Sequence, residues 1–169
     1  GHVRVYKYDA TKTVAQTNQL LPDNTINPNF GPIGWNRLGA DIDGEDDSDY
    51  SGSSVSLSFD ASNNPIVAIG ANGNDGSGSY AGHVRVYKYD ANKTTAQTNQ
   101  LIPNTTTINP NFGPVGWNRL GADIDGEASG DYSGYSVSLS ADGTIVAIGA
   151  LYNGGNGSYS GHVRVYKYD

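Results

Sequence analysis

The nine-residue segment GHVRVYKYD occurs at residues 1–9, again at 82–90 and a third time at 161–169. The copies begin at residues 1, 82 and 161, in steps of 81 and 79 residues. Between them AQTNQL, INPNFGP, GWNRLGADIDGE, SVSLS and IVAIGA recur in the same order. Self-similarity at a fixed period indicates stacked copies of one structural unit. We therefore expect the chain to be a window on a tandem array.

Each period contains four segments that the sequence predicts to be β-strands. Residues 53–59, SSVSLSF, alternate serine with apolar residues, so the small serine face is expected to meet another element closely. Residues 65–71, PIVAIGA, are an apolar run typical of a central strand covered on both faces. Residues 82–90 alternate valine with polar and aromatic residues, and residues 116–124, GWNRLGADI, have the polarity of an outer strand.

The connections between these segments also favour antiparallel pairing. Asp-Gly within residues 140–144, SADGT, is a strong signal for a hairpin. The connection at residues 90–116 exceeds the roughly 12–15 residues usual for structureless loops, so we expect an ordered excursion there.

Four antiparallel strands per period, with small residues on the inner strands, are the pattern of a propeller blade. We expect an all-β fold of tandem four-stranded antiparallel sheets. Residues 1–52 would form a partial blade with the third and fourth strands and the long loop, residues 53–131 a complete blade, and residues 132–169 a partial blade with the first to third strands. Closed propellers use about four to eight blades, so these sheets are too few to close a ring.

Residues 133–150, SGYSVSLSADGTIVAIGA, followed by GHVRVYKY, resemble the FG-GAP type of repeat found in integrin-α-like β-propellers. The resemblance covers about half of each period and lies in the strands. It implies a propeller fold, an extracellular location and a role in adhesion or recognition. Calcium-binding blades of that family carry a DxDxDG loop between the first two strands. Here that loop is only residues 141–143, or 60–64 in the first repeat, so the metal site of the family does not carry over to this position.

The composition limits which binding partners and which cellular location are expected for the chain. The formal net charge is −7 and the isoelectric point about 4.7, which argues against a nucleic-acid partner because phosphate binding needs a basic face. No apolar run approaches the roughly 18–20 residues of a membrane helix, so we expect no membrane span in this segment. The chain has no cysteine and no methionine, which excludes disulfides and suggests a piece of a longer product. We expect it to be extracellular, secreted or at the cell surface.

Two acidic runs, residues 41–49 and 123–131, share the pattern Asp-Ile-Asp-Gly-Glu. Closely spaced carboxylates around a glycine suit a hard cation such as calcium. The candidate ligands are Asp41, Asp43, Glu45, Asp49, Asp123, Asp125, Glu127 and Asp131. The alternative is that these runs are solvated loops, in which aspartate and glycine serve turns and cap backbone amides.

Aromatic residues of the repeat could form a surface for stacking sugars. The candidates are Trp35, Trp117, Tyr87 and Tyr89, and the alternative is that they pack blade against blade. Three N-x-S/T sites, which begin at Asn92, Asn104 and Asn156, lie in predicted loops where a glycan could be attached.

Nothing in the sequence indicates the machinery of an enzyme. His2, His83 and His162 are one position of the repeated strand, which favours a structural role. No G-x-S-x-G motif stands at a strand-to-helix turn. A hydrolase that uses loop carboxylates is a third and weaker hypothesis.

The sequence therefore predicts a structural or adhesive repeat module of a large secreted or cell-surface protein. Its partners would be other copies of itself or adjacent repeats, and repeat-to-repeat packing could build an extracellular filament. The alternative is a propeller domain that binds a ligand, through carbohydrate recognition or calcium-dependent adhesion, with glycans or cell-surface proteins as partners.

Overall fold

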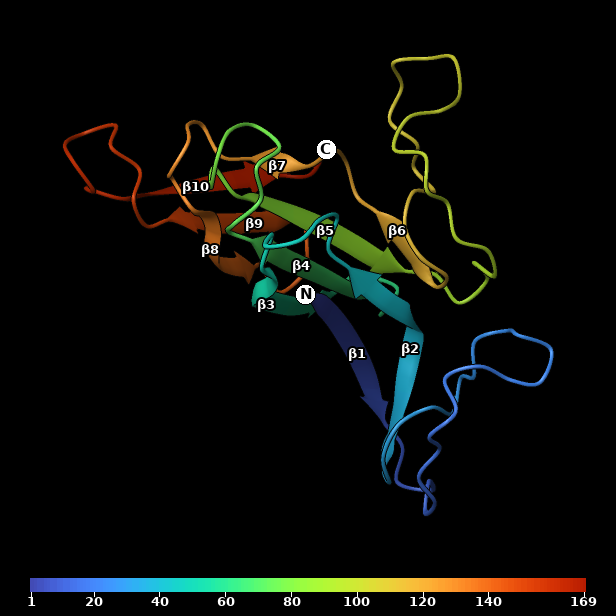
Figure 1. Ribbon diagram of the computed structural model, residues 1–169. Coiled ribbons are helices and arrows are strands. Elements are labelled where there is room, and N and C mark those ends of the chain that lie inside the picture. The colour runs from blue at the N-terminus through green and yellow to red at the C-terminus, as the bar shows by residue number, and fades with distance from the viewer.

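The computed structural model describes residues 1–169 and contains strands, turns and loops but no helix. Ten strands form three antiparallel sheets that follow one another along the chain and pack side by side (Figure 1). The predicted all-β fold of tandem blade-like sheets is confirmed, and the sheets close neither a barrel nor a ring. No helix of the length and apolar character needed to cross a membrane is present.

The first sheet has two strands, β1 (His2–Tyr8) and β2 (Trp35–Asp43). His2 lies opposite Asp43 and Tyr8 opposite Trp35, with an irregularity in register between Val3 and Val5. This sheet corresponds to the third and fourth strands of the repeat.

The second sheet contains all four strand positions of the repeat. Its elements are β3 (Ser51–Phe59), β4 (Pro65–Ala71), β5 (His83–Tyr89), β6 (Trp117–Arg119) and β7 (Ile124–Asp125). The order is β3-β4-β5-β6, and β7 also pairs with β5. The sequence predicts one strand over residues 116–124, whereas the structure divides this position into β6 and β7. Its counterpart β2 runs unbroken.

The third sheet has the order β10-β9-β8, with β8 (Ser133–Leu139), β9 (Ile145–Ala150) and β10 (His162–Lys167). The predicted turn joins β8 to β9, where Gly143 has a φ of 70°. Six residues of β10 pair with β9, and no strand pairs with the other edge of β10.

The long connections at residues 9–34 and 90–116 project from the first and second sheets as narrow arms (Figure 1). Backbone pairing orders them: in the second arm Gln97 bridges to Gly113 and Leu101 to Ile108. At the base of this arm the guanidinium of Arg119 lies 4.4 Å from the ring centre of Phe112, a cation–π contact. These contacts agree with the predicted ordered excursion.

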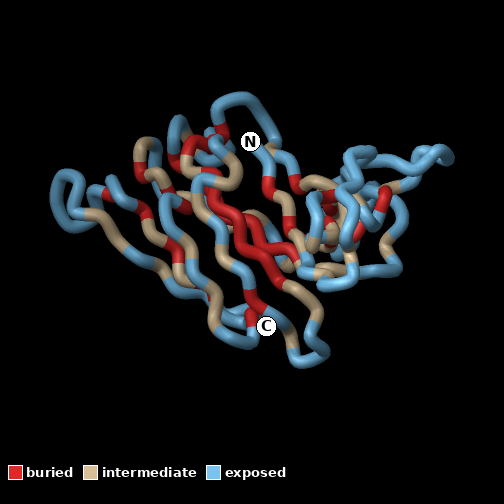
Figure 2. Tube along the Cα trace, turned by 90° about the horizontal axis from the view of Figure 1, so that it is seen from below, coloured by how far each residue is buried: buried red, intermediate tan, exposed pale blue.

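The apolar core lies between neighbouring sheets rather than inside one of them, and the buried residues concentrate on the central strands (Figure 2). Central strand β4 contributes to both cores, as its apolar run predicts: Val67 and Ile69 face the first sheet, while Ile66 and Ala68 face the third. The first core consists of Val3, Val5, Ile42, Val67, Ile69, Tyr87 and Trp117, and the second of Ile66, Ala68, Val84, Val86, Val146 and Ile148. Apolar burial of this kind stabilises by about 25 cal/mol per Å².

The serine face of β3 meets β8 directly, in agreement with the expectation that this face lies close to another element. The Ser54 hydroxyl donates to the carbonyl of Gly134 at 2.7 Å, and the Ser58 hydroxyl donates to that of Ser140 at 2.7 Å. The Ser56 hydroxyl oxygen accepts from the backbone N–H of Leu139 at 2.9 Å. Because serine is small, two strands of different sheets come close enough to share side-chain-to-backbone hydrogen bonds.

Candidate functional site

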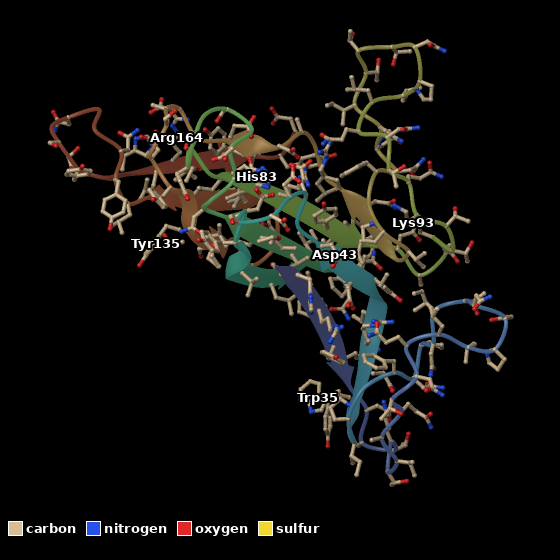
Figure 3. The ribbon with its side chains drawn as sticks, viewed as in Figure 1. Trp35, Asp43, His83, Lys93, Tyr135 and Arg164 are labelled. Carbon is tan, nitrogen blue, oxygen red and sulfur yellow. The ribbon has the colours of Figure 1, made fainter.

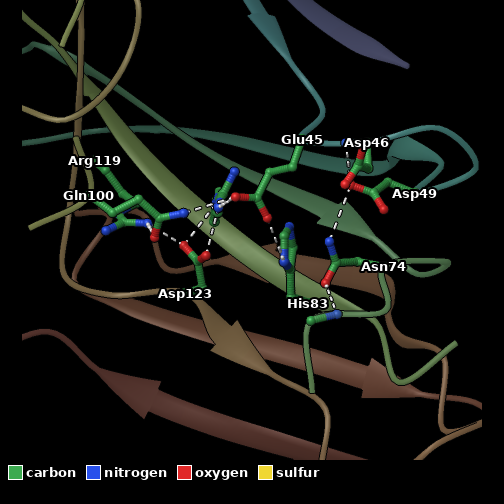
Figure 4. A network of polar contacts seen from close by, with 10 residues as sticks. Glu45, Asp46, Asp49, Asn74, His83, Gln100, Arg119 and Asp123 are labelled. Carbon is green, nitrogen blue, oxygen red and sulfur yellow. Dashed lines mark hydrogen bonds and ion pairs between the residues drawn. The ribbon is translucent and has the colours of Figure 1, made fainter. Parts of the chain in front are cut away.

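The junction between the first and second sheets contains a charged network (Figure 4). Glu45 follows β2 and forms an ion pair with Arg85 of β5, and its carboxylate lies 3.9 Å from Nδ1 of His83. The Arg85 guanidinium also binds Asp123, through Nε at 2.8 Å and Nη2 at 2.6 Å, so Nη2 contacts both carboxylates. Arg85 therefore joins carboxylates from two successive repeats.

Arg119 and Gln100 extend this network into the second arm. Arg119 donates to Asp123 and, at 3.0 Å, to the side-chain carbonyl of Gln100. The Gln100 amide donates to Glu45 at 2.9 Å, which closes a ring of five side chains. Arg85 and Arg119 are buried, and buried charges require such partners because desolvation is otherwise strongly unfavourable.

Burial and neighbouring charges set the protonation of the network. Burial lowers the pKa of His83, and the charge of Arg85 lowers it further. Burial acts to raise the pKa of Asp123, but the hydrogen bond from Arg85 and the charges of Arg85 and Arg119 outweigh it and hold that pKa below its usual value. Near neutral pH Asp123 is therefore a carboxylate and the imidazole of His83 is neutral.

Glu45, His83 and Asp123 each place a ligand atom within 4.8 Å of the others, so the cluster has the donor set of a cation site. The guanidinium of Arg85 already lies against both carboxylates. It supplies the positive charge that a metal would bring and would repel a cation placed beside it. The arrangement is therefore suited to joining repeats through ion pairs.

A similar arrangement occurs at the junction between the second and third sheets. Glu127 forms an ion pair with Arg164, and its carboxylate lies 3.7 Å from Nδ1 of His162. In the first sheet Arg4 binds Asp41 at 2.6 Å, but no glutamate reaches this arginine. Each junction thus uses a glutamate of one repeat and the His-x-Arg pair of the next.

The structure separates the predicted calcium ligands within each acidic run. Asp41 binds Arg4 and Arg37, and Asp43 is exposed at the end of β2. Asp49 is buried and accepts hydrogen bonds from the Asp46 N–H at 3.0 Å and the Asn74 amide at 3.2 Å.

The second acidic run follows the same pattern. Asp125 is exposed, and Asp131 is buried and accepts from Ala128 at 3.1 Å and Asn153 at 2.8 Å. The carboxylates that do come together, Glu45 and Asp123, belong to different runs. Calcium binding by these residues stays a prediction.

The predicted aromatic residues lie mostly in the interior. Trp117 and Tyr87 are buried, and the Trp117 ring packs edge-on against half-buried Tyr89 at 5.3 Å. Trp35, the counterpart of Trp117, is 44% exposed and packs against Tyr8 at the outer end of the first sheet (Figure 3). Of the four candidates for sugar stacking, only Trp35 is exposed.

A second aromatic cluster, which the sequence reasoning missed, lies in the loops of the second junction. Tyr80 stacks on Tyr132 at 5.4 Å, and Tyr152 contacts Tyr132 at 5.3 Å and Tyr159 at 5.6 Å. Tyr80, Tyr132 and Tyr159 have φ values of 52°, 54° and 55°, a left-handed conformation that is uncommon for bulky residues. The recurring Asp-Tyr-Ser-Gly and Gly-Ser-Tyr motifs were the signal that could have revealed it.

The three predicted glycosylation sites are accessible. Asn92, Asn104 and Asn156 are all exposed and lie in loops or turns. Their modification stays a prediction.

Comparison with known families agrees with the architecture. Residues 122–166, which include β7, β8, β9 and most of β10, match the family model of the FG-GAP repeat. The resemblance stated from the sequence is therefore confirmed, and the chain contains a propeller-type repeat module. No curated protein matches the chain.

Proposed function

We propose that this chain, which carries an FG-GAP repeat, is a structural or adhesive repeat module of a large secreted or cell-surface protein. Its repeats would polymerise by face-to-face packing into an extracellular filament. FG-GAP repeats typically occur in extracellular or cell-surface proteins, which supports this compartment. The proposed role is structural and involves no catalysis.

The observation that carries the proposal is the burial of one pair of valines in the three copies of GHVRVYKYD. The exposed fractions are 9% and 8% for Val3 and Val5, 0% and 8% for Val84 and Val86, and 67% and 65% for Val163 and Val165. In the first two copies the next sheet covers the pair. The third copy presents the same residues uncovered, so another sheet of this repeat is the surface that fits them.

The rest of the outer face of the third sheet supports the same partner. Ile145 of β9 is 39% exposed, whereas its counterpart Ile66 of β4 is 4% exposed and packs against the third sheet. A contiguous exposed apolar face of this kind is typical of an interaction surface. The interface inside the chain indicates that its occupant is a further copy of the repeat.

Sedimentation velocity over a range of concentrations tests the proposal. We expect the wild-type chain to form assemblies that grow with concentration, and Val163→Asp/Val165→Asp to shift them to monomers. Val14→Asp is the matched control, because Val14 is 64% exposed on the first arm, away from this face. A chain that remains monomeric at every concentration would contradict the proposal.

The second candidate function is carbohydrate binding, which the loop tyrosines favour. Tyr152 and Tyr159 are 44% and 74% exposed, and exposed aromatic rings suit the apolar faces of sugars. Binding to a glycan array that is lost in Tyr152→Ala but retained in Tyr135→Ala would support it. No binding by the wild-type chain to any glycan would exclude this role for the glycans tested.

A further inference from the structure

Two tyrosines of successive repeats lie ring against ring at the second junction. Tyr80 belongs to the connection between β4 and β5, and Tyr132 directly precedes β8. Their ring centres are 5.4 Å apart and their ring planes are inclined by 19°, so the rings are stacked. The contact therefore joins the second and third sheets through their loops.

Backbone contacts hold the two loop segments side by side. The Tyr132 N–H donates to the Tyr80 carbonyl at 3.0 Å. The next N–H along the chain, that of Ser133, donates to the Ala81 carbonyl at 2.9 Å. Gly82 forms a parallel bridge with Ser133 and allows this approach, because a Cβ at this position would collide with the Ser133 carbonyl oxygen. The main chain thus fixes the positions from which the two rings project.

The backbone conformation of the two tyrosines is unusual. Tyr80 and Tyr132 have φ values of 52° and 54°, in the left-handed region, where a bulky side chain is unfavourable and glycine or asparagine is better tolerated. Of the eight non-glycine residues with positive φ, four are tyrosines, and these occupy only two positions of the repeat: Tyr50 and Tyr132, and Tyr80 and Tyr159. Packing alone does not require a tyrosine in this conformation. Such outliers point to a function of the side chain.

We propose that Tyr80 and Tyr132 are a site of oxidative cross-linking, at which a carbon–carbon bond joins the two rings as dityrosine. The co-reactant is hydrogen peroxide, used by a haem peroxidase. Tyr80 is 40% exposed, so its phenol is accessible to an oxidant, and half-buried Tyr132 lies against it. The site goes beyond the proposed assembly of repeats and does not depend on it, because both tyrosines belong to one chain.

The reaction balances with one molecule of peroxide. Each phenol loses one electron and one proton and becomes a phenoxyl radical. The radicals couple through one Cε atom of each ring, and the hydrogen on each of these carbons then leaves as a proton while each oxygen regains one. The pair has lost two hydrogen atoms, which reduce one hydrogen peroxide to two waters. Because the rings are already in contact, the radicals form next to each other and coupling needs no diffusional encounter.

Ring orientation favours this pair over its neighbour. Tyr152 also contacts Tyr132, at 5.3 Å between ring centres, but the two ring planes are inclined by 81°. Coupling requires overlap between the π orbitals of two ring carbons, which near-parallel planes provide and perpendicular planes do not. The bond is therefore expected between Tyr80 and Tyr132, and thus between repeats rather than within one.

The consequence of the bond is a covalent connection between two sheets that otherwise hold together by packing and hydrogen bonds. It closes a loop of the chain from residue 80 to residue 132. Cross-links stabilise mainly by restricting the unfolded chain, and more so for long loops. Cross-linked monomers should therefore unfold at a higher urea concentration than untreated monomers.

Treatment of the dilute full chain with a haem peroxidase and hydrogen peroxide tests the site. Monomers recovered from a denaturing gel should show the blue fluorescence of dityrosine and a mass lowered by two hydrogen atoms. Trypsin cleaves after lysine and arginine, so Tyr80 lies in the peptide 38–85 and Tyr132 in the peptide 120–164. We expect these two peptides to be joined. A bond between Tyr132 and Tyr152 would instead remain within the peptide 120–164.

Phenylalanine variants make the test specific. Tyr80→Phe and Tyr132→Phe retain a ring for stacking but lack the phenol oxygen, so each should abolish the joined peptides. Tyr50→Phe and Tyr135→Phe are the matched controls, because these residues lie in the same two peptides and are 55% and 52% exposed. Both controls should form the bond as wild type does. Monomers without joined peptides, or joined peptides that persist in Tyr80→Phe, would overturn the site and leave the proposed assembly, which sedimentation decides, unaffected.

Discussion

The two junctions of this chain have nearly the same sequence but differ in how far they are closed. At the first junction the side chain of Arg85 is 7% exposed and that of Glu45 is 33% exposed. At the second, their counterparts Arg164 and Glu127 are 31% and 48% exposed. The first junction is covered by a fourth strand and an arm of the following repeat, which supply Asp123 and Gln100. At the second junction no strand pairs with the outer edge of β10.

At the first junction, residues of the following repeat thus complete the charged network of the preceding one. A buried ion pair is strongly destabilised when one partner is removed, whereas an exposed pair contributes only about 0–1 kcal/mol. The same glutamate and arginine therefore have different energetic importance at the two junctions. Counterpart residues of the two junctions therefore serve as matched controls for each other.

The largest effect is expected for the tryptophans. Trp117→Ala should lower the free energy of unfolding by about 3–5 kcal/mol, because it leaves a cavity in the buried first core. Trp35→Ala should change the stability of the monomer by less than about 0.5 kcal/mol, as exposed substitutions do. Urea unfolding of dilute protein measures both. Equal losses would mean that the two environments do not differ.

The next largest loss of stability is expected for the two counterpart glycines, Gly39 and Gly121. Gly121→Ala should cost about 1–2 kcal/mol, because alanine is unfavourable in the left-handed conformation. Gly39→Ala should cost a further 1–3 kcal/mol or so, since its Cβ would press on Val115 and Trp117. Chemical denaturation of each variant gives the comparison. A larger loss for Gly121→Ala would contradict the difference in packing.

A smaller effect is expected for the glutamates. Glu45→Gln should cost about 1–2 kcal/mol, because it weakens a charged hydrogen bond to buried Arg85, although Asp123 remains as a partner. Glu127→Gln should cost no more than about 1 kcal/mol, since its pair is more exposed. Thermal melting at low and high salt checks the result, and only the Glu127 pair should be strongly screened.

The smallest expected effect is the change of stability with pH that His83 causes. Burial, together with the charge of Arg85, lowers the pKa of His83 below its value of about 6.5 in the unfolded chain, against the opposing charges of Asp123, Glu45 and Asp125. The unfolded state therefore binds more protons just below pH 6.5, and stability should fall as the pH is lowered through that region. Melting curves from pH 7.5 to 5 should show this slope.

His83→Gln should flatten the slope, whereas His2→Gln, at the exposed counterpart, should leave it unchanged. A slope that persists in His83→Gln would assign the effect to another group.

Local patterns in the sequence predict most of the strands correctly, because alternation and apolar runs report on the faces of a single strand. The serine face of residues 53–59 and the doubly covered strand at residues 65–71 are examples. The break in the fourth strand at residues 120–123 was not predictable in this way, since the sequence there is the same as in unbroken β2.

The charged network also could not be predicted from patterns of neighbouring residues in the sequence. Glu45 and Asp123 come from separate acidic runs and meet through Arg85 of an intervening strand. Spacing along the chain grouped the carboxylates by run and suggested calcium. The structure groups them by junction, because packing of one sheet on the next decides which charges are neighbours.

The sequence by itself determined the repeat, its period, the strand positions and the side of each strand that is apolar. These properties depend on residues close together in the chain, and they are the same in every copy. Only the tertiary structure decided which copy is buried: Val84 and Trp117 are fully enclosed, while Val163 and Trp35 are open to solvent. The physical reason is that burial belongs to a pair of surfaces, and identical residues differ when one copy has a neighbouring sheet and the other has none.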